Sequence, residues 1–281
     1  MNPKPTAPGT IEAHLGKSWE KIAHLVDTHT MDVQSWLPTR TPRAAHFDGV
    51  GVEAGSSGIP VSLLNLALGG RYPPRMSDEA IDTEIKTVKI FFADRDVPWA
   101  WWLGPFPQPL DMGQRLERNG LTLNPPALPA MAAHLPTQFP MLNPDAQVWL
   151  AASRADLEAA STIRRIAFHF PEKAALNYFE AMAEDWLIRD PARLYLARLP
   201  DGPPAAIGAL IMGAGLPGVY VMATLPEYRR QGLGKAILAR ILSDATDDGS
   251  DFIALTASPQ GYPLYRQFGF EHIFDYSIYV P

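Results

Sequence analysis

Residues 219–236 read Val-Tyr-Val-Met-Ala-Thr-Leu-Pro-Glu-Tyr-Arg-Arg-Gln-Gly-Leu-Gly-Lys-Ala. An apolar, strand-like run comes first, followed by a basic turn with two glycines and then by the start of a helix. Unpaired backbone N–H groups at a helix start bind anions, and the positive end of the helix dipole strengthens this binding. Glycine lets the backbone come close to a bulky ligand. The stretch therefore predicts a phosphate-binding loop.

The charge around this turn differs from the charge of the whole chain. The chain has 24 Lys and Arg residues against 30 Asp and Glu residues, a net charge of -6, and its pI is about 5.6. Arg229, Arg230 and Lys235 nevertheless gather at the turn. Positive charge at a helix start opposes the helix dipole unless an anion compensates it. We therefore expect an anionic ligand at the turn, whereas the overall acidity argues against nucleic acid as a partner.

Two motifs carry a resemblance to a known family. The spacing Arg229-x-x-Gly232-x-Gly234 resembles the acetyl-CoA pyrophosphate motif of the GNAT superfamily of acyl-CoA N-acyltransferases. Residues 255–270 read Leu-Thr-Ala-Ser-Pro-Gln-Gly-Tyr-Pro-Leu-Tyr-Arg-Gln-Phe-Gly-Phe, similar to the next GNAT strand, its helix and the Leu-Tyr-x-x-x-Gly-Phe signature. The motifs occur in the expected order, and the resemblance covers residues 146–281.

This resemblance implies a set of site residues for acetyl-CoA. Main-chain N–H groups of the turn would hold the pyrophosphate, and the end of the strand before it would offer its edge to the pantetheine arm. No metal is implied. The implied cofactor-binding residues are Met222, Ala223, Thr224, Arg229, Arg230, Gln231, Gly232, Leu233, Gly234 and Lys235.

Tyr265 takes the position of the family's general acid, which donates a proton to the departing CoA thiolate. The alternative is a core tyrosine in an amphipathic helix, where Leu264 and Phe268 also repeat. Ser258 and Gln260 occupy the stretch in which many relatives have an asparagine that touches the cofactor arm.

The general base stays open at this stage. An amine acceptor has a pKa of about 10 and must lose a proton before it attacks a thioester. Tyr220 acting through a water, Glu180, Glu184 and Asp185 are candidates. Acidic residues off the apolar stripe of a helix are, however, most often a solvated face.

Length and proline distribution predict two domains. A chain of 281 residues exceeds one compact module, and prolines crowd residues 121–145. After that connector, the pattern predicts the order β-α-α-β-β-β-α-β-α-β. We expect an α/β protein with a mixed sheet and two GNAT-like domains in tandem. Residues 1–140 would form a degenerate N-terminal copy, and residues 146–281 the acetyl-CoA-binding N-acetyltransferase domain.

The degenerate first copy rests on a short internal match. Residues 115–121, Arg-Leu-Glu-Arg-Asn-Gly-Leu, align with residues 264–270, Leu-Tyr-Arg-Gln-Phe-Gly-Phe, so that Gly120 falls on Gly269. Leu116 then stands where the second copy has Tyr265. The first half also lacks a basic glycine turn of the same pattern.

Several function classes find no support in the sequence. There are no cysteines, so disulfides, a thiolate nucleophile and a Cys-based metal site are excluded. No His-Glu-x-x-His or Gly-x-Ser-x-Gly motif occurs, which disfavours a metal site and the common hydrolases. The opening residues lack an apolar signal core and no run approaches membrane-spanning length, so we expect a cytoplasmic protein without a membrane partner. Trp99, Trp101 and Trp102 are expected to fill a core.

The sequence thus predicts an N-acetyltransferase that moves an acetyl group from acetyl-CoA to an amine of a small molecule or peptide by direct attack in a ternary complex. One alternative is a non-catalytic acyl-CoA-binding or regulatory module, and another is an enzyme that uses a longer acyl-CoA. A homodimer is compatible with the sequence.

Overall fold

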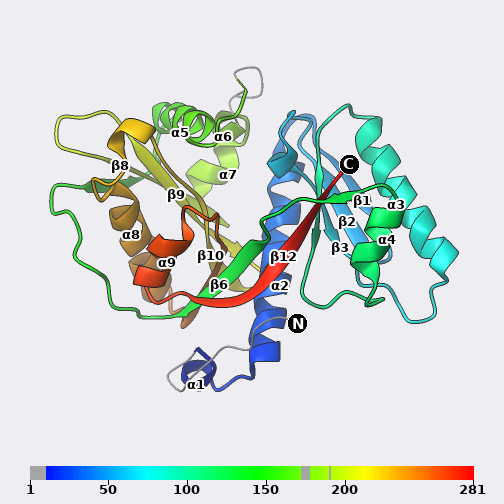
Figure 1. Cartoon of the computed structure of the whole chain (residues 1–281). Helices are drawn as coiled ribbons and strands as arrows, with labels where there is room; N and C mark the ends of the chain where they lie inside the picture. Colours follow the sequence, from blue (N-terminus) through cyan, green and yellow to red (C-terminus); the bar gives the residue numbers. More distant parts are fainter. Residues whose placement is uncertain (1–10, 172–177, 190) are drawn as a thin grey trace. The chain divides into compact units, whose positions relative to one another are not determined.

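The computed structural model describes residues 11–171, 178–189 and 191–281 and divides into two compact units (Figure 1). Among the described residues, the first unit contains residues 31–129 and 274–281, and the second contains those of 11–30 and 130–273. None of the described helices is long and apolar enough to cross a membrane.

The first unit is a mixed sheet with helices packed on it. Its strand order is β1-β2-β3-β4-β12, with β5 beside β12. The β3–β4 pair is parallel, whereas β1–β2, β2–β3 and β4–β12 are antiparallel. The elements are η1 (Pro38–Arg40), β1 (Ala45–Asp48), β2 (Val52–Ser56), η2 (Ser62–Leu64), β3 (Asn65–Gly69), α3 (Asp78–Ala93), β4 (Ala100–Leu103), α4 (Met112–Arg118), β5 (Thr122–Leu123) and the end of β12 (Glu271–Val280).

The tryptophans of β4 and its approach lie in the core of this unit, as expected. Trp99, Trp101 and Trp102 are 5%, 0% and 4% exposed. The Trp101 indole N–H donates to the carbonyl of Gly69 at 3.0 Å, so its one polar group is paired inside the core. Phe92 stacks on Trp99 with ring centroids 4.6 Å apart.

The second unit is also a mixed sheet, and it contains both motifs. Its order is β6-β11-β10-β9-β8-β7, and only the β10–β11 pair among its recorded ladders is parallel. Helix α8 contacts β7 to β10, and α5 contacts β9 and β10; in Figure 1 these two helices lie on opposite faces of the sheet. The elements are α1 (Ile11–Leu15), α2 (Trp19–Trp36), β6 (Leu128–His134), β7 (Gln147–Leu150), α5 (Arg154–Ala167), α6 (Tyr178–Ala181), α7 (Ala183–Ile188), β8 (Ala192–Arg198), β9 (Ala206–Gly213), β10 (Leu216–Thr224), η4 (Pro226–Tyr228), α8 (Leu233–Asp247), β11 (Phe252–Thr256) and α9 (Tyr262–Gln267).

The element order predicted for residues 146–281 is confirmed with one exception: the described part of the second predicted helix, residues 172–188, is divided into α6 and α7. The sequence also predicts that Asp156 opens the first helix of this domain as its N-cap, and this prediction was wrong. Asp156 does not cap the first helix: Ser153 is the N-cap, and its side chain accepts from the Asp156 N–H while the Asp156 carboxylate accepts from the Ser153 N–H, forming a capping box. The first residues of the second predicted helix, 172–177, lie outside the described part of the chain.

The internal match has a counterpart in local geometry. Helices α4 and α9 both end at a glycine in the left-handed region, with φ +81° at Gly120 and +80° at Gly269. The residue after each glycine donates to the carbonyl at the aligned position, Leu121 to Leu116 at 3.0 Å and Phe270 to Tyr265 at 3.1 Å. The run β3-α3-β4-α4 also repeats the run β10-α8-β11-α9, including the parallel strand pair. These parallels support two copies of one fold.

Each unit includes a strand from the other half of the sequence. Strand β6 pairs with β11 from Phe252↔His134 to Thr256↔Ala130 in the second unit. The end of β12 pairs with β4 in the first unit. Residues 11–30 also belong to the second unit. The second sheet is therefore completed by residues from within the predicted connector, residues 121–145. The prediction that this whole segment is a connector was wrong, because Pro129 precedes residues 130–134, which pair with β11, and so does not interrupt that ladder.

A fragment of residues 146–281 should fail to fold as a soluble monomer, because it lacks β6 and leaves the edge of β11 unpaired. We expect it to aggregate in size-exclusion chromatography and to show no cooperative thermal transition by circular dichroism. A fragment of residues 128–281, which restores β6, should give more soluble protein. Equal solubility and equal cooperativity of the two fragments would contradict the structural role of β6.

Candidate functional site

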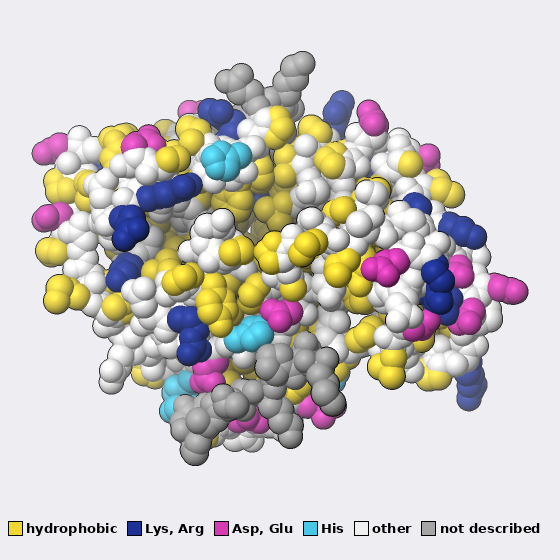
Figure 2. Space-filling view, in the orientation of Figure 1, with side chains coloured by type: hydrophobic (Ala, Val, Ile, Leu, Met, Phe, Trp, Pro, Cys, Tyr) yellow, Lys and Arg dark blue, Asp and Glu magenta, His cyan; other side chains and the backbone are white. Residues whose placement is uncertain are grey.

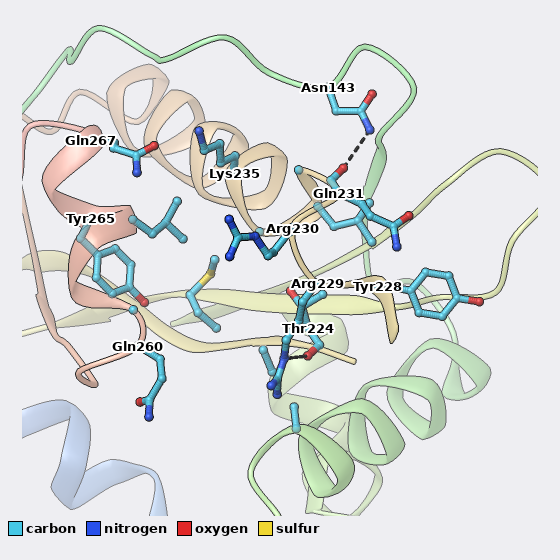
Figure 3. Close-up of a pocket in the computed structure, with 18 of the residues that line it drawn as sticks. Asn143, Thr224, Tyr228, Arg229, Arg230, Gln231, Lys235, Gln260, Tyr265 and Gln267 are labelled. Carbon is cyan, nitrogen blue, oxygen red and sulfur yellow. Dashed lines mark hydrogen bonds between the residues drawn. The ribbon is translucent and has the colours of Figure 1, made fainter. Parts of the chain in front are cut away.

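A cleft of about 1320 Å³ lies in the second unit, where β10 ends and α8 begins (Figure 3). Its walls come from β10, the turn into α8, the start of α9, the end of α5 and the connector at residues 141–144. Every residue for which the sequence implied a cofactor contact lines this cleft, and so does Tyr265. They are Met222, Ala223, Thr224, Arg229, Arg230, Gln231, Gly232, Leu233, Gly234, Lys235 and Tyr265.

The two parallel strands separate at the cleft. Strand β10 pairs with β11 at Gly218 and Val219, and no pair of this ladder follows among the described residues. On its other side, β10 pairs with β9 up to Thr224 through an irregularity between Tyr220 and Ala223, where Val221 has φ +55°. The β11 side of β10 is thus a free strand edge, which an extended ligand can join through main-chain hydrogen bonds.

The turn into α8 presents unpaired N–H groups. Gly232 is the N-cap residue with φ +87°, and no side chain caps the helix. Among the described residues, none accepts a hydrogen bond from the backbone N–H groups of residues 230–235. Such orphan donors at the positive end of a helix are an anion site.

Side-chain charge at the cleft is positive. Arg229, Arg230 and Lys235 line it, and within the described chain none of them forms an ion pair. No Asp or Glu occurs among the described lining residues. Figure 2 shows several Lys and Arg side chains on the face of the second unit where α8 and α9 lie. The Arg229 guanidinium Nε donates to the Thr224 carbonyl at 3.2 Å, which ties the turn to the end of β10.

Tyr265 has a buried ring and a hydroxyl group that points into the cleft (Figure 3). The ring packs edge-on against Phe270, with centroids 5.8 Å apart. Burial raises the pKa of the Tyr265 phenol well above its ordinary value, because the charged form would lose its hydration. The phenol therefore stays protonated at neutral pH, as a proton donor must. The ring is therefore part of the core, and the general-acid role of the hydroxyl stays a prediction.

The residues that replace the family's asparagine also lie here. Ser258 and Gln260 line the cleft. The Ser258 hydroxyl accepts the Gly261 N–H at 3.1 Å at the start of α9, so Ser258 is occupied by the local turn. Figure 3 shows Gln260 beside Tyr265.

Tyr220 is held by a histidine that the sequence did not single out. Its hydroxyl lies 3.0 Å from His29 Nε2, and His29 Nδ1 lies 3.0 Å from the Gly213 carbonyl. Because a carbonyl only accepts, Nδ1 carries the proton, and in the neutral ring Nε2 accepts from Tyr220. His29 is 0% exposed. The partners are 191 positions apart in the sequence, so no local sequence signal pointed to this contact.

The other base candidates lie elsewhere. Glu184 and Asp185, in α7, are not among the cleft-lining residues, and the side chain of Glu180 lies outside the described residues. Within the described part of the chain, no cluster of three or more His, Cys, Asp and Glu residues could hold a metal. His169, two residues after α5 and with φ +54°, does line the cleft.

Replacing Tyr220 by Phe should destabilise the protein by about 1–3 kcal/mol, because the buried Nε2 of His29 loses its donor. Urea unfolding followed by tryptophan fluorescence measures this change. Tyr262→Phe is the matched control, because Tyr262 is less buried and its hydroxyl has no recorded hydrogen bond in the described structure; we expect a change within about 0.5 kcal/mol. Equal stability of the two variants would show that the Tyr220–His29 hydrogen bond contributes nothing.

Comparison with known proteins identifies the class of this fold and site. The model of the acetyltransferase (GNAT) domain family matches residues 169–279. Mycothiol acetyltransferase from Arthrobacter sp. (strain FB24) is 30% identical over 171 residues, covering 56% of this chain and 47% of that protein. Mycothiol acetyltransferase from Clavibacter sepedonicus is 34% identical over 125 residues, covering 42% of this chain and 40% of that protein. The chain therefore spans less than half the length of these relatives.

Solved structures agree on the fold over nearly the whole chain. A GCN5-related N-acetyltransferase from Kribbella flavida superimposes with a TM-score of 0.66 at 21% identity, covering 92% of this chain and 94% of that one. A tandem GNAT protein from the clavulanic acid biosynthesis pathway superimposes with a TM-score of 0.59 at 14% identity, covering 94% of both. Residues 169–279 thus match the GNAT acetyltransferase domain family, and the fold of the chain is that of tandem GNAT proteins.

Proposed function

We propose that this protein is an N-acetyltransferase that moves an acetyl group from acetyl-CoA to an amine of a small molecule or peptide. The observation that carries the proposal is the cleft itself. One wall offers orphan N–H groups at residues 230–235 with unpaired positive side chains, and another offers the protonated hydroxyl of Tyr265. In acetyl-CoA, the pyrophosphate and the thioester sulfur lie at opposite ends of the extended pantetheine arm. Binding the first and protonating the second therefore need these two features at the two ends of that arm.

The same physical argument assigns the cofactor to the second copy alone. Helix α3 is the counterpart of α8, but Ser77 already caps it by accepting the Ala80 N–H at 3.2 Å. Asp78 and Glu79 occupy its first turn and would repel a phosphate. Helix α8 has no acidic residue in its first turn. We therefore assign acetyl-CoA binding to the domain of residues 146–281. Residues 1–140 would form a degenerate copy that does not bind it.

In the reaction, the acceptor amine attacks the thioester carbon in a ternary complex. A main-chain N–H near Met222 would polarise the thioester carbonyl. Collapse of the tetrahedral intermediate breaks the carbon–sulfur bond, and Tyr265 donates its proton to the leaving thiolate. The amine must first lose a proton, and His169 or the Tyr220–His29 pair would accept it, directly or through water. Glu180, whose side chain lies outside the described residues, stays a third candidate.

A non-catalytic acyl-CoA-binding module is the second candidate. The observation that favours it is the lack of Asp and Glu among the described residues that line the cleft. An enzyme with a longer acyl donor is compatible with the same cleft, and competition between acyl-CoAs of different chain length tests it. The relatives are mycothiol acetyltransferases that this chain covers only in part, so our proposal for the acceptor goes no further than an amine.

Acetyl-CoA should raise the melting temperature of the wild type and leave that of Gly234→Glu unchanged. At a ligand concentration 100 times the dissociation constant, binding stabilises by about 2.7 kcal/mol. A side chain at Gly234 fits the fold, since its Cβ would lie 3.7 Å from Thr224 Oγ1 and 3.9 Å from Leu264 Cδ2. A carboxylate is also favourable at a helix start. It would, however, occupy the space of the phosphates and repel their negative charge. Gly232 is the poorer choice, because its φ is +87° and a Cβ would lie 2.8 Å from that of Asn143.

Ser243→Glu is the control for this measurement, because it adds the same charge to α8 outside the cleft. It should keep the full acetyl-CoA shift. No shift of the wild type at saturating acetyl-CoA would overturn the proposed donor.

Tyr265→Phe should lower kcat at least tenfold in a thiol-release assay with acetyl-CoA and a panel of amines, because the leaving thiolate loses its proton donor. The dissociation constant of acetyl-CoA should stay within threefold of the wild-type value. Unchanged turnover in the variant would remove Tyr265 from the chemistry. Binding without turnover in both proteins, across the whole panel, would favour the non-catalytic module.

A further inference from the structure

We propose that Asn143, in the connector before β7, is a positioning residue that aims the Gly232 N–H into the pyrophosphate site. This inference rests on the proposed function, because it assigns a role within the binding of CoA. Asn143 lines the cleft opposite the turn into α8. Its Nδ2 donates to the Gln231 carbonyl at 2.8 Å, the hydrogen bond drawn at the top right of Figure 3.

The direction of one peptide plane links this hydrogen bond to the ligand. In a trans peptide, the carbonyl of one residue and the N–H of the next point in opposite directions. Holding the Gln231 carbonyl toward Asn143 therefore turns the Gly232 N–H away from Asn143. That N–H has no acceptor within the described part of the chain, so it is free to donate to an anion in the cleft.

This peptide is easily turned over without such a contact. Gly232 has φ +87°, and Arg230, two residues earlier, has φ +64°. Glycine occupies both signs of φ at little cost, so rotation of the 231–232 peptide meets no side chain at Gly232. A rotated peptide would point the Gln231 carbonyl at the phosphates and replace a donor by a repelling acceptor.

Asn143 is itself fixed by the connector. Its Oδ1 accepts the Asp145 N–H at 3.0 Å, which fixes the amide so that Nδ2 faces Gln231. Its Cβ also lies against Gly232, since a side chain there would come within 2.8 Å. The connector and the turn are thus in direct contact at the peptide between Gln231 and Gly232. The direction of this peptide decides whether the Gly232 N–H faces the anion.

Calorimetric titration with CoA and with dephospho-CoA tests the proposal in the full-length protein. Asn143→Leu keeps the size of the side chain and removes the donor, and Asn143→Ala removes both. Thr137→Val is the matched control, because the Thr137 hydroxyl makes a similar hydrogen bond from the same connector to the Phe268 carbonyl, at 2.8 Å. Neither Thr137 nor Phe268 lines the cleft.

Both Asn143 variants should bind CoA about tenfold more weakly than the wild type, and Thr137→Val should bind within twofold. The defect should be the same with dephospho-CoA, because both ligands carry the pyrophosphate and differ in the 3′-phosphate. Wild-type affinity in folded Asn143 variants would overturn the proposal, as would a defect that disappears with dephospho-CoA or a defect of the same size in Thr137→Val. A wild type that binds neither ligand would instead overturn the proposed function.

Discussion

The separation of β10 from β11 after Val219 is the constraint on which the site depends. Two parallel strands that stayed paired would use their N–H and C=O groups on each other and leave no edge for a ligand. The irregularity at residues 220–223 releases that edge while β9 holds the other side of β10 in place. After this separation from β11, strand β10 leads into the turn before α8. The unpaired edge of β10 and the orphan N–H groups of the turn therefore line the same cleft. Loss of the separation would remove both at once.

Charge distinguishes the helix starts of the two similar folds. Helices α3 and α8 follow corresponding strands, yet α3 begins with a capping serine and two acidic residues, and α8 begins with a glycine and no cap. An uncapped helix start among Arg229, Arg230 and Lys235 lowers the stability of the fold. A bound anion would offset this loss. In the first copy, Ser77 caps the start of α3, which supports our proposal that only the second copy binds a phosphate. Its Leu116, in place of Tyr265, is consistent with that proposal.

The sequence was sufficient for the features that depend on neighbouring residues. The glycine turn, the order of strands and helices after the connector and the position of Tyr265 at the cleft all follow from local spacing, and the structure places the implied residues along one cleft. Contacts between distant segments could not be read in this way. His29 reaches Tyr220 across 191 residues, and Asn143 reaches Gln231 across 88. Neither residue type is unusual at its position, and the prolines around Asn143 indicated only a connector. The capping box at Ser153 was within reach of sequence reasoning, because Ser-x-x-Asp precedes the apolar positions of α5.

The exchange of strands gives a physical reason for the chain to keep both copies. Strand β6 lies near the end of residues 1–140 and pairs with β11, the strand that carries the chain toward α9 and Tyr265. Residues 11–30 bring His29 against the strand that leads to the irregularity, at Gly218 and Tyr220. The connector after β6 brings Asn143 to the turn before α8. A second copy taken alone would retain every residue of the recognised motifs and lose the segments that hold those motifs in their binding conformation. Sequence motifs therefore mark where the ligand would bind, whereas the geometry of the site depends on residues that the motifs do not contain.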